Sequence, residues 1–474
     1  MDLLRLSRIS PRLKYSVNLA KMLSVSKEST HKIIETYFAA QPLDYVKEME
    51  EFERINGPHV PEDRRAFIFV PAFNEECNLK NLVYQYVRQI SPSGPLDHDL
   101  YEVCFVVNYP ESVDSKLNKL CAERFERAID ILLDEKKKHQ NIHILSKSFR
   151  EGEGSLGRAR KYGMDYCLWR ILKKPASSID QCIIISNEGD TLKIPNAYVS
   201  KFTQLFEKGE PKFVQGKIEY PAEITDICEP VRLFVGCREA VHFGQGLAGD
   251  EFPYFDGIMP IGRNFAVSPK VYAQVGGIDP IRRKDTDDDM NFGTDIHVLL
   301  GDRVKSVCTI PLITNPRREV IIVRDIVAGR KEDSKKSYEN FHENRALYDS
   351  KYSDILAIVR EKIPSKIPSR AIQCELVNQY FQWVLISCYK ANLSHVAGFD
   401  EIITKHHEHK ISYWEKEKQL CAAFERYLQR TTKEMRYTIE KKLIIEALFW
   451  FNKFIEPLGA AYGCTNEGLK SVLQ

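Results

Sequence analysis

A short apolar run that ends in two carboxylates limits what this chain can fold into. Residues 182–185 are Cys-Ile-Ile-Ile, and polar residues flank them on both sides. An apolar run that does not alternate with polar residues is typical of a strand buried on both faces, as in a parallel sheet covered by helices. Glu188 and Asp190 follow directly, and open α/β sheets bind ligands at the carboxyl ends of their strands. Because Mn²⁺ and Mg²⁺ prefer oxygen ligands, the pair is a candidate metal site, with a plain polar turn as the alternative.

The length and composition of the chain favour a globular protein with two or three domains. It has 474 residues, of which 43% are hydrophobic and 28% charged. The 68 basic and 66 acidic residues nearly cancel, which gives no argument for a nucleic-acid partner. The 12 cysteines are scattered singly, as in a cytoplasmic protein with reduced thiols. No apolar run reaches the length of a membrane span, and the N-terminus lacks the apolar core of a secretory signal, so we expect a cytoplasmic protein.

Strand and helix patterns alternate on both sides of this run. Residues 67–70 and 101–107 are apolar enough for buried strands, and a helical pattern follows each. We expect the first strand to end at Pro71, because proline cannot donate to the ladder, and Asn74 to cap the next helix. The alternation predicts a mostly parallel sheet with helices on both faces. Further strands are expected at residues 142–145, 213–220 (more exposed), after Gly262, and 303–313.

The pattern divides the chain into a helical arm (residues 1–62), an α/β domain (63–330) and a helical region (331–474). Basic residues between Arg5 and Lys21 stand among leucines, and such a basic amphipathic segment can lie on an anionic membrane surface, but packing of the arm on the main domain is the favoured interpretation. The apolar helix faces after residue 331 predict docking on the main domain or on a second subunit, which leaves a homo-oligomer open. The cluster of His406, His407 and His409 is interpreted as solvated surface histidines rather than as a metal site.

Three further segments carry chemistry-bearing residues. A glycine-rich loop before Arg158 and Arg160 lacks the Gly-Lys-Ser/Thr ending of a P-loop, but both arginines can reach phosphate from a helix start; a solvated face is equally open. Residues 244–262 are rich in glycine and predict a mobile or substrate-shaped loop. The acidic run Asp285-Thr-Asp-Asp-Asp289 offers either a helix cap or a general base near a substrate.

Taken in order, these motifs resemble those of family-2 glycosyltransferases over residues 64–325. Residues 67–76 resemble the opening strand and nucleotide loop of that family, and residues 157–165 the helix that follows. Glu188-Gly-Asp190 falls where the family has its metal-binding Asp-x-Asp. Residues 262–279 resemble the segment before the acceptor site, and Asp288-Asp289 falls where the family has Glu-Asp.

This resemblance implies the GT-A fold, a nucleotide-sugar donor such as a UDP- or GDP-sugar, Mn²⁺ or Mg²⁺ on Glu188 and Asp190, and inversion at the anomeric carbon. It implies Asp289, with Asp288 next, as the general base. The acceptor would be a saccharide, a lipid-linked or a small molecule, and membrane contact would be at most peripheral. The residues that it places on the nucleotide side are Pro71, Ala72, Asn74, Glu75, Asn108, Arg158 and Arg160.

Several positions depart from the family pattern. Glu188 replaces the first aspartate of the metal motif, and Asn108 stands where the family often has an aspartate. The Asp-Gly-Ser that often follows is missing, and so is the Gln-x-x-Arg-Trp of processive synthases, so polymer extrusion is not expected. Two alternatives remain, a nucleotidyltransferase and a non-catalytic scaffold. The chain lacks a glycine-rich, lysine-containing loop after its first strand, which argues against the nucleotidyltransferase.

Overall fold

A computed structural model of the chain forms two compact units. Unit 1 comprises Met1–Pro221, Pro260–Asn315 and Asn344–Tyr352, and unit 2 comprises Ala222–Met259, Pro316–Glu343 and Ser353–Gln474. The sequence-predicted boundaries at residues 62 and 330 stay predictions. The residues that the structure describes are 28–110, 115–149, 156–207, 212–235, 262–278, 292, 293, 295, 296, 299, 300, 304–329, 351–369, 372 and 376.

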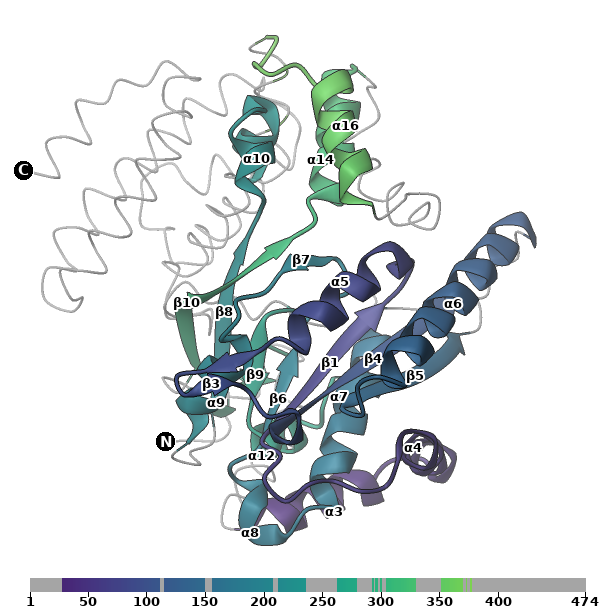
Figure 1. Ribbon diagram of the computed structural model, residues 1–474, viewed down its shortest axis with the longest axis vertical. Coiled ribbons are helices and arrows are strands. Elements are labelled where there is room, and N and C mark those ends of the chain that lie inside the picture. The colour runs from purple at the N-terminus through teal and green to yellow at the C-terminus, as the bar shows by residue number, and fades with distance from the viewer. Residues whose placement is uncertain are drawn as a thin grey trace, which may run out of the picture. The chain divides into compact units, whose positions relative to one another are not determined.

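Unit 1 is built on an eight-stranded sheet with the strand order β5-β4-β1-β6-β9-β8-β10-β7 (Figure 1). Strands β5, β4, β1 and β6 are parallel, β9 is antiparallel to both its neighbours, β8 and β10 are parallel, and β7 is antiparallel to β10. The predicted α/β class with a mixed, mostly parallel sheet is therefore confirmed. The strands are β1 (Ala66–Ala72), β4 (Tyr101–Pro110), β5 (Ile142–Phe149), β6 (Ile183–Ser186), β7 (Thr191–Lys193), β8 (Phe213–Glu219), β9 (Phe265–Val267) and β10 (Val304–Thr314), besides a small hairpin of β2 (Ile90–Ser91) and β3 (Gly94–Pro95).

Helices cover both faces of this sheet, which is why its central strands are apolar without alternation. On one face, Ile68 and Val70 of β1 share a core with helices α5 (Glu76–Tyr86), α6 (Ser115–Lys136) and α9 (Tyr198–Phe206) (Figure 1). On the other face, Phe69 lies against Gly163 of α7 (Leu156–Leu172). Full burial of each large apolar side chain contributes about 1.5–3 kcal/mol, so the two-sided core is the main source of stability in this unit.

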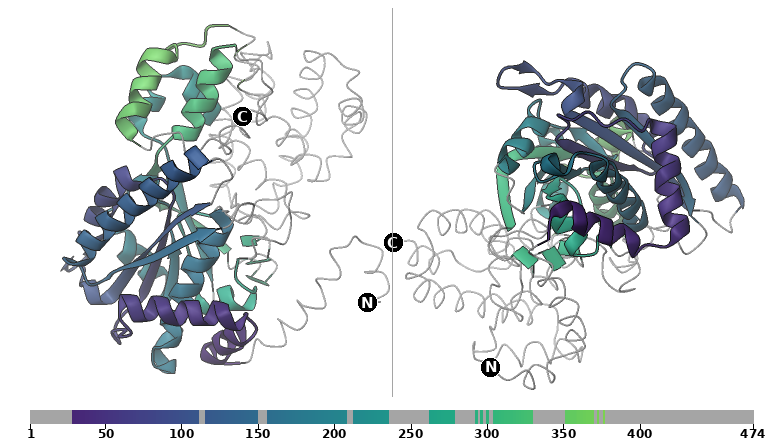
Figure 2. Two further views of the ribbon diagram at one scale, coloured as in Figure 1. Left: turned by 90° about the vertical axis from the view of Figure 1, so that its right-hand side faces the viewer. Right: turned by 90° about the horizontal axis from the view of Figure 1, so that it is seen from below.

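A buried carboxylate joins the N-terminal helices to the rest of unit 1. Asp165 of α7 is fully buried and accepts hydrogen bonds of 2.7 Å from the hydroxyls of Tyr37, Tyr45 and Tyr272 and from Nζ of Lys161. Figure 2 shows the N-terminal helices, in purple, on one side of this unit. The helices that these residues join are α3 (Thr30–Ala39), α4 (Leu43–Asn56), α7 and α12 (Pro269–Gln274). The described part of the unit also contains α8 (Ala176–Ile179) and a 3₁₀ turn (His98–Leu100).

The described part of unit 2 is helical. It contains α10 (Ala222–Thr225), a helical segment at 229–235, α14 (Arg317–Val327) and α16 (Tyr352–Lys362). The chain leaves the helical conformation after α16, shortly before Pro364 and Pro368. Helix α14 was not predicted. The later predicted helices and the cluster of His406, His407 and His409 lie outside the described residues.

Several predicted element ends are corrected. Strand β1 continues through Pro71 and Ala72. Pro71 is tolerated there because its missing N–H faces β6, and the ladder between β1 and β6 already ends at Phe69 and Ser186. Asn74 is not the cap of α5: Glu75 occupies that position, and Asn74 has a φ of 56°. Strands β4 and β5 run further than predicted, and the first four residues of β8 are buried.

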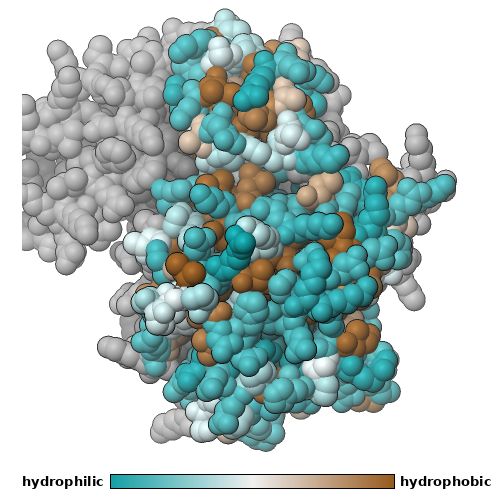
Figure 3. Space-filling model, in the orientation of Figure 1, coloured by the Kyte–Doolittle hydropathy of each residue, from teal (hydrophilic) through white to brown (hydrophobic). Residues whose placement is uncertain are grey.

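The face of the described residues that Figure 3 draws is mostly hydrophilic. Figure 3 shows separate, small hydrophobic patches between hydrophilic side chains on the face drawn there. Within the described ranges, no helix is both long and apolar enough to cross a membrane.

Candidate functional site

The two predicted metal ligands lie on a tight turn directly after β6. β6 is buried and parallel to β1, and the ladder is extended by hydrogen bonds from the N–H of Asn187 to Phe69 O and from the N–H of Gly189 to Pro71 O, both 3.0 Å. A Cβ added to Gly189 would lie 2.8 Å from Pro71 O and 2.8 Å from Cγ of Glu75. Only glycine therefore allows the turn to approach the end of β1 this closely.

Two buried asparagines hold the backbone of this turn. Oδ1 of Asn187 accepts from the N–H of Glu188 at 2.8 Å and from the hydroxyl of Thr191 at 2.7 Å. Nδ2 of Asn78, in the first turn of α5, donates to the carbonyls of Gly189 at 2.8 Å and Thr191 at 2.7 Å. Sequence reasoning missed both residues. The one signal for Asn78 is that asparagine is a poor helix former, which favours a side-chain role there.

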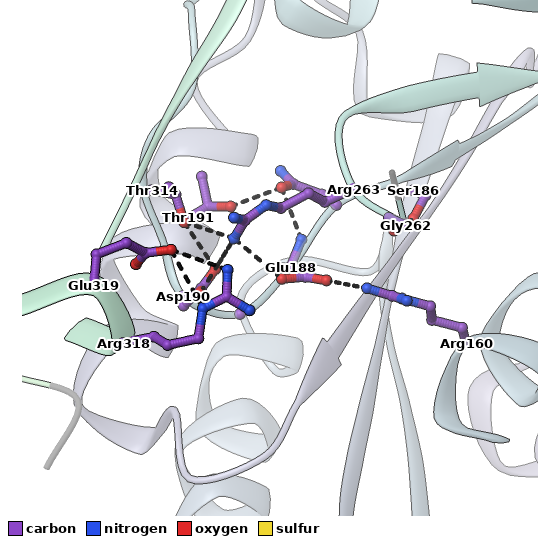
Figure 4. A network of polar contacts seen from close by, with 12 residues as sticks. Arg160, Ser186, Glu188, Asp190, Thr191, Gly262, Arg263, Thr314, Arg318 and Glu319 are labelled. Atoms are coloured by element: carbon purple, nitrogen blue, oxygen red, sulfur yellow. Dashed lines mark hydrogen bonds and ion pairs between the residues drawn. The ribbon is translucent and has the colours of Figure 1, made fainter. Parts of the chain in front are cut away.

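Glu188 and Asp190 are each paired with arginine (Figure 4). Arg160 donates a hydrogen bond to Oε1 of Glu188. Nη1 of Arg263 lies 3.3 Å from Oε2 of Glu188 and 3.4 Å from both carboxylate oxygens of Asp190, and it donates to the hydroxyl of Thr314 at 2.9 Å. The carboxylates are only 12% and 16% exposed, so the guanidinium groups supply the positive charge that their burial requires.

The strand-to-strand connection that carries Arg263 is held by several hydrogen bonds. The hydroxyl of Ser186 donates to Gly262 O at 2.6 Å, and Nε2 of Gln215 donates to Arg263 O at 2.8 Å. Asn264 has a φ of 56°, a left-handed conformation that asparagine tolerates, and its Nδ2 donates to the carbonyls of Lys217 and Ile310. Sequence reasoning missed Arg263, although it stands within a predicted motif.

These residues fit a divalent metal ion poorly. Two carboxylates and the Thr314 hydroxyl are suitable hard ligands, but Nη1 of Arg263 already lies among those same oxygens. Over the residues that can be described, no cluster of three or more histidine, cysteine or acidic side chains could hold a metal.

Two of the residues predicted for the nucleotide side, Asn74 and Asn108, lie near the carboxyl ends of two neighbouring strands. Ala72 of β1 pairs with Val107 of β4, so Asn74 and Asn108 follow adjacent strand positions. Each is only 7% exposed. Nδ2 of Asn74 and Oδ1 of Asn108 have no hydrogen-bond partner among the described residues. A buried polar atom without a partner costs roughly 1–3 kcal/mol, so such atoms are candidates for ligand contacts.

The remaining predicted residues divide into those that the structure describes and those that it does not. Pro71 and Glu75 are buried at the turn, and Arg158 is half-buried in the first turn of α7. Asp288, Asp289 and residues 244–261 lie outside the described residues. Phe292 and Ile296, which follow Asp289 at helical spacings, are buried at 3% and 0% exposure.

The fold and site define an α/β protein with buried polar groups at the carboxyl edge of a mostly parallel sheet. No protein-family model matches the chain, and no curated protein matches it by sequence. Among similar solved structures, S. aureus TarS 1–349 has 10% identity and a TM-score of 0.33, covering 85% of this chain and 92% of that one. The same fragment in complex with UDP-GlcNAc has 11% identity and a TM-score of 0.33, over the same shares. At this TM-score the likeness supports no conclusion about fold or function.

Proposed function

We propose that the protein is an inverting glycosyltransferase with a GT-A fold that transfers a sugar from a nucleotide-sugar donor to an acceptor hydroxyl. The observation that carries the proposal is the pair of buried atoms without partners, Nδ2 of Asn74 and Oδ1 of Asn108, at the ends of β1 and β4. They lie at the sheet edge where the sequence motifs resemble a nucleotide-sugar site. One is a donor and the other an acceptor, as the edge of a nucleotide base requires.

In this proposal the chain's own residues divide the work. Asn74 and Asn108 bind the nucleotide, and Arg158, at the start of α7, faces the diphosphate, where a helix N-terminus also favours an anion. Asp289, with Asp288 next, takes the proton from the acceptor hydroxyl. The loop at 244–262 excludes water, so that transfer is faster than hydrolysis. The Mn²⁺ or Mg²⁺ that the family resemblance implies stays a prediction. The residues present argue against it, because Nη1 of Arg263 lies among the oxygens that would bind such an ion.

A non-catalytic scaffold is the second candidate, and one observation favours it. Both predicted metal ligands are already neutralised by arginine side chains, as expected of a site that has lost its ion. A transferase usually hydrolyses its donor slowly without an acceptor, whereas a scaffold does not. Release of nucleoside diphosphate from a panel of nucleotide sugars therefore separates the two candidates.

The nucleotide site itself is tested by binding of UDP and GDP to Asn108→Ala. Loss of one ligand hydrogen bond should weaken binding about tenfold. The free protein should keep its stability to within about 1 kcal/mol, because Oδ1 loses no hydrogen bond to a described residue. Asn141→Ala is the matched control: this buried asparagine precedes β5 at the opposite edge of the sheet, so its removal should leave nucleotide affinity unchanged. Equal affinity of wild type and Asn108→Ala would contradict the assignment.

A further inference from the structure

Arg263 stands where a cation bound by the two carboxylates would stand. Its Nη1 is 3.3 Å from Oε2 of Glu188, 3.4 Å from both oxygens of Asp190 and 2.9 Å from Oγ1 of Thr314. All four neighbours are oxygen atoms from three residues, which is the environment that a hard divalent ion prefers. Figure 4 shows the guanidinium between these side chains.

Each carboxylate of this pair already has an arginine partner without an ion. Glu188 and Asp190 contribute two negative charges, and Arg160 and Arg263 contribute two positive charges that arginine retains at any physiological pH. The side chain of Arg263 is 11% exposed, so moving it into water would remove a cationic partner from two largely buried carboxylates. A divalent ion would have to displace the guanidinium group and compensate for the lost ion pairs.

The backbone around Arg263 also holds this arrangement in place. The carbonyl of Gly262, which precedes Arg263, accepts a hydrogen bond from the hydroxyl of Ser186. The carbonyl of Arg263 itself accepts one from Nε2 of Gln215. A Cβ at Gly262 would lie 2.1 Å from Cζ of Arg160, so this glycine lets the two guanidinium groups approach the same carboxylate. The sheet thus positions Arg263 before any ligand arrives.

We propose that Arg263 is the resident cation of the Glu188–Asp190 pair and competes with divalent metal ions for these carboxylates. The consequence for the donor, that nucleoside diphosphate binds without added metal, rests on the proposed function. The competition itself does not, because it concerns only residues of this chain and the metal.

The test uses Mn²⁺ alone, titrated into the full chain, with free Mn²⁺ measured by electron paramagnetic resonance. Arg263→Gln should bind Mn²⁺ at least about tenfold more tightly than wild type, because the competing charge is gone. Arg263→Lys keeps a positive charge and is the matched control, expected to bind Mn²⁺ as weakly as wild type. The gain should disappear in Arg263→Gln combined with Asp190→Asn, which places the new site at this pair.

Wild type and Asp190→Asn decide the matter even if Arg263→Gln does not fold. Tight Mn²⁺ binding by wild type that is lost in Asp190→Asn would overturn the inference, as would equal affinity in wild type and a folded Arg263→Gln. Equal, weak binding by wild type and Asp190→Asn supports it.

A second measurement follows UDP and GDP by thermal shift in EDTA and in Mn²⁺. Affinities within about threefold of each other support the inference, and a gain of about tenfold or more with Mn²⁺ overturns its consequence for the donor. If neither nucleotide binds under either condition, the proposed function fails, while the Mn²⁺ titrations still decide the role of Arg263.

Discussion

Arg160 donates a hydrogen bond to Glu188, so a residue predicted to bind phosphate and a residue predicted to bind metal are paired with each other. The two side chains are 5% and 12% exposed. The pair connects the N-terminal part of α7 to the turn after β6. A ligand that binds to Arg160 or to Glu188 therefore has to disturb the hydrogen bond between them.

Gly262→Ala tests how closely this pair is packed. The added Cβ would lie 2.1 Å from Cζ of Arg160, the far end of a flexible side chain, so we expect the guanidinium to move away from Glu188 while the protein still folds. The expected loss is about 1–3 kcal/mol in the free energy of unfolding, measured with urea. In the Arg160→Ala background the same change should cost clearly less, because the clash is gone. Equal costs in both backgrounds would place the strain elsewhere.

Asp165→Asn should strongly destabilise unit 1. The carboxylate is fully buried and accepts from three tyrosine hydroxyls and Lys161, and an amide cannot accept all four bonds. Removing one partner of a buried charged group costs about 3–5 kcal/mol, which thermal or urea unfolding would detect. Asp44→Asn is the control, since its side chain is 97% exposed and the change should stay within about 0.5 kcal/mol. A similar small effect for Asp165 would show that the network contributes little.

Gly163→Ala should destabilise the protein, although alanine is the better helix former. A Cβ at this position of α7 would lie 2.4 Å from Cδ2 of Phe69 and 2.8 Å from Cγ2 of Val106, both in buried strands. Such overpacking costs about 1–3 kcal/mol, which exceeds the helix-propensity gain of about 1 kcal/mol. Phe69→Leu should relieve part of the clash, so the double variant should be more stable than the sum of the single effects predicts. Strict additivity would refute this packing argument.

Acidification should destabilise the protein from about pH 6.5 downward through a buried cluster around Glu102 of β4. Glu102 is fully buried and contacts Arg64 at 2.6 Å, Arg170 at 3.2 Å and His143 at 3.8 Å. Burial lowers the pKa of His143 from 6.5 to about 4, against the attraction of Glu102. Burial alone would raise the pKa of Glu102, but protonated His143 and the guanidinium groups of Arg170 and Arg64 outweigh it and lower that pKa from 4.5 to about 2.

Both shifts have the same sign. Between pH 6.5 and 4 the unfolded chain binds a proton at His143 that the native state does not bind. The free energy of unfolding therefore decreases by up to about 3 kcal/mol as the pH is lowered through this range. Between pH 4.5 and 2 Glu102 adds a further loss for the same reason. Urea unfolding at a series of pH values would show this slope, and His143→Gln should flatten it between pH 6.5 and 4. An unchanged slope in that variant would assign the acid sensitivity to other groups.

Local sequence determined the frame of the site. The apolar run at 182–185 was long enough and unbroken enough to predict a strand buried on both faces, and the carboxylates after it lie at the predicted edge. The helical pattern predicted after residues 101–107 is confirmed by α6 at Ser115–Lys136. Helix α14 was missed because Val320, Ile321, Ile322 and Val323 are β-branched and suggest a strand, and packing overrides that weak preference.

Only the tertiary structure decided which charges meet. Arg160 is 28 residues from Glu188 along the chain, and Arg263 is 75 residues from it. Tyr37 and Tyr272 reach Asp165 from 128 and 107 residues away. Periodicity reports which side of an element is buried, but it carries no information about which distant side chain will neutralise a buried charge. That choice depends on strand order and helix placement, because a buried carboxylate takes whichever cation or hydroxyl the fold brings within hydrogen-bond distance.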